Sequence, residues 1–542
     1  MANAKFKNIG EYTMGMKEMP EVLVRETGKV WAHSFENFRV KTYVPTASGL
    51  VDKVNYGFKA PYLVVFEEKE QSFDEVIAWA EKSGLADVAR TNGSSVVFVF
   101  PTTGSWSTAS PDIYADLIAE TKIHQYYVDG IVTMKNRFTG EWGDNFIRGA
   151  IFRAYLYGFG ESADFLAKNC LKTIQGEYLW GPGEITPAAC ILFGLSVVPQ
   201  PERNDIPVIS IGNSDEINQA LSCCEHLKIE DTADFKADFF NFVVRFKRWC
   251  GHLDIEADYE EIGVVEEPGS IELTTSPDNR GDDRETKKHE VGYVAYYNKG
   301  LFDNGPVPMM FAFHGGGDST FYITQVSGWW RVAHKHNFLL IAIENHLDST
   351  ATEMVEMIGK LKERYNIDEK RIYASGFSMG GCKSWDCYQE YPNVFAALAP
   401  MDATFEVGTN SFGQPAPCEI NRAVPVPVFY AGGEITPLPE LPFQAEKCTD
   451  RIRYLFEVNK VKKPYAVSFE KQDNWENKIW GINGDRTVQL RDESRDAVLT
   501  MQYFDSEDGV CRTVLASIDN QGHECREHTC EQAWLFMKNF TR

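Results

Sequence analysis

The stretch that decides the fold reads Arg-Ile-Tyr-Ala-Ser-Gly-Phe-Ser-Met-Gly-Gly and spans residues 371–381. Its apolar first half has the character of a buried strand, and the residues after it are compatible with a helix. Ser378 lies between the two inside the pattern G-x-S-x-G, which is typical of a nucleophile elbow. Such a turn strains its central residue and leaves no room for side chains two positions away. Steric crowding therefore explains why glycine occupies positions 376 and 380, as Gly376 and Gly380. Ser378 is therefore the candidate nucleophile, although a glycine-rich turn with an incidental serine fits the same letters.

A second motif lies upstream, at the end of another strand-like run. Residues 308–313 are apolar, and the next five residues read His-Gly-Gly-Gly-Asp from His314 onward. Loops of this kind supply backbone N–H donors to an acyl oxyanion, and glycine is needed because a Cβ would hold the backbone away from the substrate. We expect His314 itself to hold the loop rather than to act as a base.

The candidate base lies near the C-terminus. His523 follows the strand-like run 514–518 and precedes an amphipathic segment around 533–537, so a loop can bring it to the elbow. A nucleophile that comes first and a histidine that comes last is the chain order of the α/β-hydrolases, and it differs from that of other serine-triad folds.

The acid of the triad is expected after the strand-like run 426–431, where Glu434 is our first choice. A carboxylate there would hold the imidazole tautomer of His523. Two alternatives stay open: Glu440 lies further along the same loop, and Asp402 follows the preceding strand. Each of the three is also compatible with an ordinary surface carboxylate.

Several segments in register resemble a known family. The segments are residues 313–317, 328–333, 338–342 and 365–381, and together they are similar to the polyhydroxybutyrate depolymerase and feruloyl esterase group of carboxylic-ester hydrolases. The resemblance covers about residues 259–542.

The resemblance implies an α/β-hydrolase fold and assigns the site. Ser378 would be the nucleophile and His523 the base, and the oxyanion hole would be formed by the N–H groups of Met379, Gly315 and Gly316. Family members usually carry an aspartate after a His-Gly pair, whereas this chain has Ala-Gly-Gly-Glu at residues 431–434.

Chain length and net charge limit the number of domains and the classes of partner. A chain of 542 residues predicts two domains with sizeable cores. Its formal net charge of −24 repels nucleic-acid backbones and anionic membranes, so we expect neither as a partner. The first residues contain no apolar signal region, and no apolar run reaches the length of a membrane span, which predicts a cytoplasmic protein.

The 12 cysteines follow no zinc-binding spacing, and free buried thiols are expected. A metal cluster of His523, Cys525, His528 and Cys530 is set aside, because His523 already has a better use in the triad loop. We therefore predict neither a metal nor a cofactor.

The N-terminal half repeats the C-terminal half in outline. Residues 61–67 parallel 308–314, and residues 157–163 parallel 375–381, which places Gly160 where Ser378 stands. The segment Glu67-Glu68-Lys69-Glu70 replaces the glycine loop, and carboxylates there would repel an oxyanion. We therefore predict two tandem lobes, a degenerate non-catalytic one over residues 1–255 and a catalytic one over 256–542. An unrelated N-terminal domain is the alternative.

Further expectations concern the edges of the lobes. A helix over 235–249 would close the first lobe, the runs 269–274 and 290–297 would form an opening hairpin of the second, and an insert over about 436–510 would form a lid. The tryptophans at positions 329, 330 and 385 would either line the substrate pocket or pack in the core. The sequence leaves open whether the protein is a homo-oligomer.

Together these features predict a serine carboxylic-ester hydrolase that acts through an acyl-enzyme on a small ester, aromatic or hydroxycinnamoyl esters included. Two alternatives are a serine peptidase of the same fold and a non-catalytic binding protein built on a hydrolase scaffold.

Overall fold

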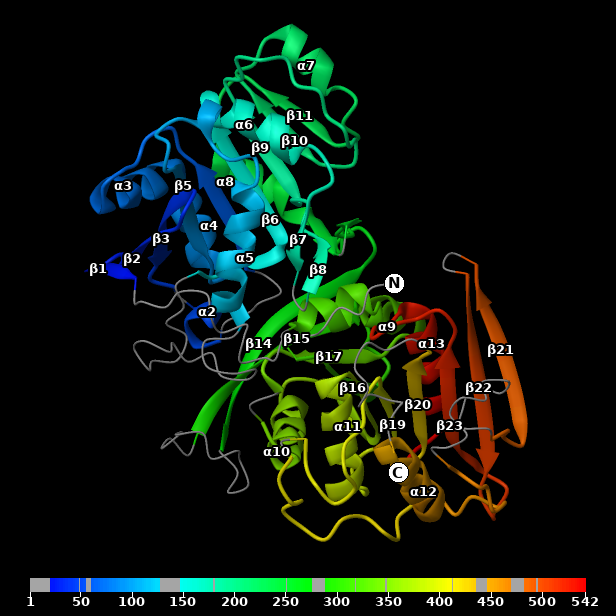
Figure 1. The fold of residues 1–542 in the computed structure, drawn as a ribbon. Coiled ribbons are helices and arrows are strands. Elements are labelled where there is room, and N and C mark those ends of the chain that lie inside the picture. The colour runs from blue at the N-terminus through cyan, green and yellow to red at the C-terminus, as the bar shows by residue number, and fades with distance from the viewer. Residues whose placement is uncertain are drawn as a thin grey trace. The chain divides into compact units, whose positions relative to one another are not determined.

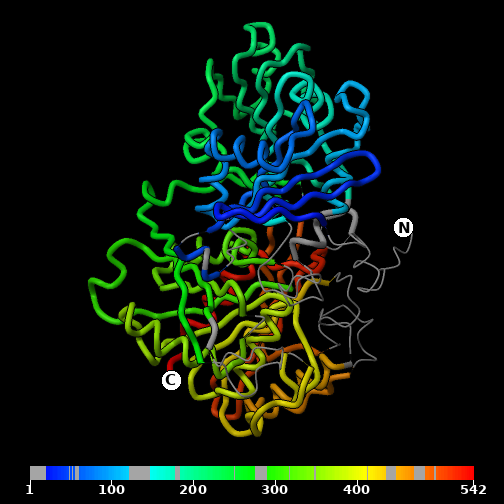
Figure 2. The backbone as a smooth tube through the Cα atoms, turned by 90° about the vertical axis from the view of Figure 1, so that its left-hand side faces the viewer, coloured from blue at the N-terminus to red at the C-terminus, as the bar shows by residue number. Residues whose placement is uncertain are grey.

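The computed structural model describes residues 20–542 except 48, 55–59, 127–146, 179–180, 250, 275–287, 317, 347–348, 412, 435–445, 469–481 and 494–495. The chain divides into two compact units, Met1–Ala257 and Asp258–Arg542. The path of the chain within each unit can be followed in Figures 1 and 2. No helix of the described residues is long and apolar enough to cross a membrane.

The C-terminal unit is built on one ten-stranded sheet. Its strands are β14 Val264–Thr274, β15 Lys288–Asn298, β16 Val307–Phe313, β17 Leu339–Ile343, β18 Ile367–Phe377, β19 Ala397–Met401, β20 Val428–Gly433, β21 Arg486–Asp492, β22 Ala497–Asp505 and β23 Cys511–Ile518. They lie in the order β14-β15-β17-β16-β18-β19-β20-β23-β22-β21 (Figure 1).

The directions of these strands define the fold. From β17 to β23 the neighbouring strands are parallel, while β14, β15, β22 and β21 add antiparallel pairs at the two edges. Parallel strands need a crossover, and helices provide it on both faces. This is the α/β-hydrolase fold expected from the sequence, and the predicted opening hairpin is confirmed as β14 and β15.

Helices cover both faces of this sheet. They are η3 Tyr322–Val326, a π-helical turn, α9 Trp329–His336, α10 Ala351–Lys362, α11 Met379–Glu390, α12 Glu446–Val458 and α13 Glu527–Met537. One face packs against α10, α11 and α12, and its core includes Met309, Phe311 and Phe313 of β16, all fully buried. Burial contributes about 1.5–3 kcal/mol for each such side chain. On the other face α13 meets the sheet, and Trp534 stacks on Phe338 with ring centroids 3.7 Å apart.

The N-terminal unit has a nine-stranded sheet of its own. Its strands are β1 Glu21–Arg25, β2 Gly28–Ser34, β3 Phe38–Pro45, β4 Pro61–Phe66, β5 Ser95–Pro101, β6 Ala150–Phe159, β9 Ala189–Phe193, β10 Val208–Ile211 and β11 Leu227–Glu230. Two small hairpins accompany it, β7 Gln175–Tyr178 with β8 Gly181–Glu184, and β12 Phe246–Trp249 with β13 His252–Ile255. The helices are α2 Leu50–Lys53, α3 Phe73–Ser83, α4 Leu85–Asn92, η1 Trp106–Thr108, α5 Ile113–Tyr126, α6 Glu161–Cys170, α7 Asp215–Leu221, α8 Phe235–Asn241 and η2 Val243–Arg245.

The strand order of this sheet is β1-β2-β3-β5-β4-β6-β9-β10-β11. From β2 to β11 it matches the run from β14 to β23 strand for strand, with β4 in the place of β16 and β6 in the place of β18. Alternate residues of β4 enter opposite cores, Val64 on one side and Val65 on the other, as a sheet covered on both faces requires.

One expectation for the edges needs correction, and another is not tested. The helix predicted over 235–249 ends at Asn241, because the following residues leave helical geometry and Phe246–Trp249 pairs with β13, which buries Phe246 and ties Lys247 to Glu256 at 2.7 Å. The described parts of the insert include α12 and the β21–β22 hairpin, and the hairpin extends the sheet. Residues 436–445, 469–481 and 494–495 of the insert lie outside the described residues, and its role as a lid stays a prediction.

Candidate active site

The turn between β18 and α11 holds Ser378 in a strained conformation. Its φ is 53° and its ψ is −119°, a region that residues with a side chain rarely adopt. The backbone N–H of Ser378 donates to the carbonyl of Met401 at 2.9 Å, which ties the turn to β19. Such strain persists only where the surroundings impose it, and it often marks a functional site.

The glycines around Ser378 allow the turn to form. A methyl group at Gly376 would stand 2.1 Å from the carbonyl oxygen of Gly380, and one at Gly380 would stand 2.2 Å from that of Phe313. A methyl at Gly381 would meet the side chain of Ala403 at 2.5 Å. The steric restriction that the sequence suggested for Gly376 and Gly380 is therefore present, and Gly381 has one as well.

His523 lies in the loop between β23 and α13, and its Nε2 is 2.9 Å from Ser378 Oγ. Its ring also packs against Phe377, with centroids 4.7 Å apart. Burial lowers the pKa of His523 to about 4, so the imidazole is neutral near pH 7. A neutral imidazole that carries its hydrogen on Nδ1 can accept the hydroxyl proton at Nε2.

The expected hydrogen bond between Glu434 and His523 is not formed. The carboxylate of Glu434 accepts instead from the backbone N–H of Asn520 at 3.2 Å, and His523 Nδ1 is buried without a hydrogen-bond partner among the described residues. Glu440 lies outside the described residues.

Asp402 directly follows β19 and is buried, with 1% of its surface exposed. Its Oδ1 accepts from Gly433 N–H at 3.0 Å, whereas its Oδ2 is buried and has no hydrogen-bond partner in the described part of the chain. Burial raises the pKa of Asp402 well above its usual range, and the backbone N–H groups of Gly433 and Glu524 act in the opposite direction. Its φ of 47° is again a strained value.

Asp402 and His523 thus share an unusual property. Asp402 lies against the residue that follows His523, and each of the two side chains carries one buried polar atom without a partner, Oδ2 and Nδ1. Unpaired buried groups are costly and rare, and catalytic hydrogen bonds are often long until substrate binds.

Backbone amides next to Ser378 are available for an oxyanion. Met379 is the first residue of α11, and its N–H has no acceptor within the helix. The loop of Gly315 and Gly316 lies beside the same turn, since a methyl at Gly315 would stand 3.1 Å from the Phe377 ring and one at Gly380 would stand 2.6 Å from the His314 carbonyl.

His314 fastens this loop. Its two ring nitrogens lie 2.7 Å from the carbonyl oxygens of Gly315 and Glu344. His314 therefore has the structural role that the sequence suggested.

Sequence reasoning missed one carboxyl group in this loop. Asp318 ends the His-Gly-Gly-Gly-Asp motif, and its Oδ2 would stand 3.0 Å from a methyl at Gly315. Burial raises the pKa of Asp318 to about 7. The sequence could have indicated this residue, because nothing else in the sequence gives a structural reason for an acidic residue directly after an oxyanion loop.

The tryptophans named above pack in the core. The exposed fractions of Trp329, Trp330 and Trp385 are 0%, 6% and 0%, and the indole N–H of Trp385 donates to the Ala403 carbonyl at 3.1 Å. Cys525 and Cys530 are buried free cysteines whose sulfur atoms lie 3.3 Å apart. The described residues contain no cluster of three or more groups suited to a metal.

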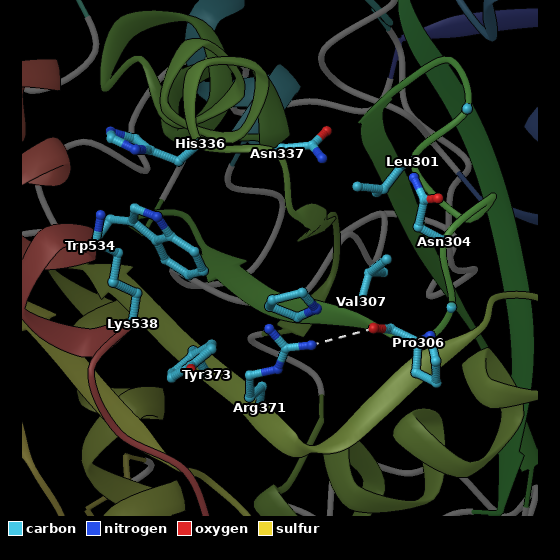
Figure 3. Close-up of a pocket in the computed structure, with 13 residues that line it drawn as sticks. Leu301, Asn304, Pro306, Val307, His336, Asn337, Arg371, Tyr373, Trp534 and Lys538 are labelled. Carbon is cyan, nitrogen blue, oxygen red and sulfur yellow. Dashed lines mark hydrogen bonds between the residues drawn. The ribbon is translucent and has the colours of Figure 1, made fainter.

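A separate cavity of about 450 Å³ lies at the beginning of β16, whereas the oxyanion loop follows its end. Arg371 reaches across it and donates to the Pro306 carbonyl at 3.2 Å, and Tyr373 and Trp534 line it (Figure 3). None of the residues that line this cavity belongs to the Ser378 site.

The N-terminal unit contains a turn of the same shape. Gly160, between β6 and α6, has a φ of 51° and a ψ of −117°, close to the angles of Ser378. A methyl at Gly160 would stand 2.4 Å from Glu68 Oε1, and that oxygen accepts from the N–H of Glu161 at 3.3 Å. The Glu68 carboxylate thus binds the N–H of the residue after Gly160, as Met379 is the residue after Ser378.

The strand order and the turn at Ser378 define an α/β-hydrolase fold. Comparisons with known proteins were made by family, by sequence and by structure. No family model matches the chain. A bifunctional acetylxylan esterase/xylanase of Neocallimastix patriciarum is 30% identical over 135 residues, which cover 23% of this chain and 19% of that relative. The chain thus spans about a fifth of the length of the curated relative it matches.

Solved structures that the chain resembles include esterases and related hydrolases. A feruloyl esterase module from Clostridium thermocellum complexed with sinapinate is 12% identical, with 51% of this chain and 88% of that chain covered and a TM-score of 0.29. An S-formylglutathione hydrolase, FrmB, from Staphylococcus aureus is 15% identical, with 36% and 88% covered and a TM-score of 0.27.

Proposed function

We propose that the protein is a serine hydrolase of carboxylic esters. The observation that carries the proposal is the distance of 2.9 Å between Ser378 Oγ and His523 Nε2, formed at a strained turn directly before the amide of Met379. A hydroxyl, a neutral imidazole and free amides around one point are the parts that acyl transfer needs.

The reaction follows from this arrangement. Ser378 Oγ attacks the ester carbonyl carbon while His523 Nε2 takes the hydroxyl proton, and the N–H groups of Met379, Gly315 and Gly316 stabilise the oxyanion. His523 then returns the proton to the departing alcohol and leaves the acyl group on Ser378. Water repeats the attack with the same base, and the acid and the free serine are released.

We assign the orienting carboxylate to Asp402 rather than to Glu434. The assignment rests on the two buried atoms without partners, Asp402 Oδ2 and His523 Nδ1. A small rotation of the imidazole that joins them would satisfy both atoms, fix the tautomer and stabilise the imidazolium formed during the attack. Glu434 already accepts from a backbone N–H.

The proposed substrate is a small ester, with acetyl and hydroxycinnamoyl groups as the acyl groups to test first. The names of the relatives motivate this choice, since one is an acetylxylan esterase/xylanase and another a feruloyl esterase module. We further propose that the N-terminal unit is a non-catalytic lobe, because Gly160 has no hydroxyl and Glu68 fills the site beside it.

The test is hydrolysis of p-nitrophenyl acetate and methyl ferulate by wild type and by Ser378→Ala, together with labelling by a fluorophosphonate. Ser384→Ala is the matched control, because Ser384 lies on the same helix and only donates to the Gly380 carbonyl at 3.2 Å. We expect Ser378→Ala alone to lose both turnover and label.

Two outcomes would reject the proposal. Unchanged ester turnover in Ser378→Ala would remove the nucleophile, and a wild-type protein that neither reacts with the fluorophosphonate nor cleaves esters would be a binding protein on a hydrolase scaffold. Preference for peptide amides over esters in the same assay would instead identify a peptidase.

A further inference from the structure

Glu344 directly follows β17 and contacts both ends of the segment that contains the oxyanion loop. Its carboxylate oxygen Oε2 accepts from the backbone N–H of Thr320 at 3.0 Å and from the Thr320 hydroxyl at 2.7 Å. Its backbone carbonyl oxygen lies 2.7 Å from Nε2 of His314. Thr320 is fully buried and Glu344 is 9% exposed, so water has little access to these contacts. The proposed oxyanion donors Gly315 and Gly316 lie between the two contact points along the chain.

Glu344 is itself fixed to the central sheet. Its backbone N–H donates to the carbonyl of Gly292 at 2.9 Å, and Gly292 belongs to β15, which pairs with β17. Groups at the end of a strand are held more precisely than groups on a loop. The end of β17 therefore gives the oxyanion loop a fixed point of attachment.

The segment attached at Thr320 also contacts the loop of the proposed base. Two residues after Thr320, the hydroxyl of Tyr322 accepts from the backbone N–H of Cys525 at 3.0 Å, and Cys525 is the second residue after His523. The Tyr322 ring stacks on Phe377, the residue before the nucleophile, with centroids 4.9 Å apart. A shift of the segment at Thr320 would therefore disturb the loop of the base as well as the oxyanion loop.

We propose that the Glu344 carboxylate is a positioning group for the reaction, which acts through Thr320 to hold the oxyanion loop in its working place. This inference rests on the proposed ester hydrolysis and adds a residue that acts through another residue and not on the substrate. A displacement of about 1 Å in a catalytic arrangement can lower the rate about 100-fold. Because the oxyanion exists only in the transition state and the tetrahedral intermediate, loss of the contact should lower kcat and leave KM in place.

The experiment changes the contact between Glu344 and Thr320 from each side. Thr320→Val replaces the hydroxyl by a methyl of similar size, Thr320→Ser keeps the hydroxyl, and Glu344→Gln keeps an oxygen that can accept but removes the charge. The first readout is kcat and KM for p-nitrophenyl acetate. The second is the inhibition constant of 1,1,1-trifluoroacetone, a ketone whose carbonyl oxygen becomes an oxyanion when Ser378 adds to its carbonyl carbon.

Thr350→Val is the matched control. The carboxylate oxygen Oε2 of Glu353 accepts from the N–H of Thr350 at 2.7 Å and from its hydroxyl at 3.1 Å, which is the same pair of contacts. Both residues are buried, and together they form the capping box at the start of α10. Thr350→Val thus removes an equivalent buried hydrogen bond that serves only the start of a helix.

We expect Thr320→Val to lower kcat roughly 10- to 100-fold and to raise the inhibition constant of the ketone by a similar factor, with KM nearly unchanged. Thr320→Ser should restore most of the turnover. Glu344→Gln should fall between the two, because hydrogen bonds to a neutral oxygen are weaker than those to a carboxylate. Thr350→Val should lower the thermal midpoint about as much as Thr320→Val and keep the kcat of wild type.

Results that overturn the inference differ from those that overturn the proposed function. If Thr320→Val and Glu344→Gln lower only the thermal midpoint and keep the kcat of wild type, the contact only stabilises the fold. A raised KM at constant kcat would assign Glu344 to substrate binding and would also overturn the inference. If Thr320→Val does not fold, the kcat and inhibition constant of Glu344→Gln decide by the same criteria. A wild type without any esterase activity would reject the hydrolase and this inference with it.

Discussion

Replacing Asp402 by asparagine should remove most of the turnover, whereas Glu434→Gln should leave it near that of wild type. The size of the effect follows from His523. Its pKa of about 4 reflects burial alone, so at pH 7 a proton on the imidazole costs about 4 kcal/mol at 1.36 kcal/mol per pH unit. A carboxylate at Nδ1 offsets this cost in the transition state, and its loss corresponds to about a 1,000-fold fall in kcat.

The assay is the kcat for p-nitrophenyl acetate at pH 7 for Asp402→Asn, Glu434→Gln and Glu440→Gln. Asparagine keeps an oxygen for the N–H of Gly433, so the loop after β20 should stay in place, and the thermal midpoint checks the fold. The reasoning is refuted if Asp402→Asn retains more than about a tenth of wild-type kcat while either glutamine variant falls by the full amount.

Further predictions test the elbow, the titration of the base and a pair of thiols. Gly376→Ala should destabilise the protein by about 3 kcal/mol, because its methyl would lie 2.1 Å from a backbone atom. Gly359→Ala on α10, where the space around the new methyl is open, should instead stabilise the protein by about 1 kcal/mol. Urea unfolding compares the two variants. Because the pKa of His523 falls to about 4 in the folded protein, the unfolded chain binds the extra proton between about pH 6.5 and 4, and the contribution of His523 to stability should fall by roughly 3 kcal/mol as the pH drops through that window. His523→Phe should lack this component, and equal pH dependence of both proteins would contradict the assignment. Cys525 and Cys530, 3.3 Å apart, should form a disulfide with oxidised glutathione as oxidant, seen as a loss of about 2 Da by mass spectrometry, and two alkylatable thiols after prolonged oxidation would count against it.

Much of the site could be predicted because its signals are local. The pattern around Ser378 specifies a strand, a strained turn and a helix within eleven residues, and the structure has each of them. His523 could be placed by chain order alone, because in this fold the loop after the last strand carries the histidine, and here that loop brings Nε2 within 2.9 Å of Ser378 Oγ.

The acid that we propose was harder to predict because the choice depends on distant contacts. Asp402 is favoured over Glu434 by its burial and by its bond to the N–H of Gly433 at the end of β20, and no stretch of letters contains that information. The helix expected over 235–249 failed for a related reason, since pairing with β13 decides the conformation of Phe246 to Trp249. Tertiary contacts override local preference at such places.

The bend at Gly160 shows that the backbone shape of the elbow does not require a nucleophile. A residue without a hydroxyl adopts almost the same angles as Ser378, so the shape of the bend is dictated by the crossing of a strand and a helix and not by the reaction. Backbone form and chemical identity are then separable at this position. The thiol of a Ser378→Cys variant would be held in the same position without any change of the backbone. The same bend could therefore position nucleophiles other than serine.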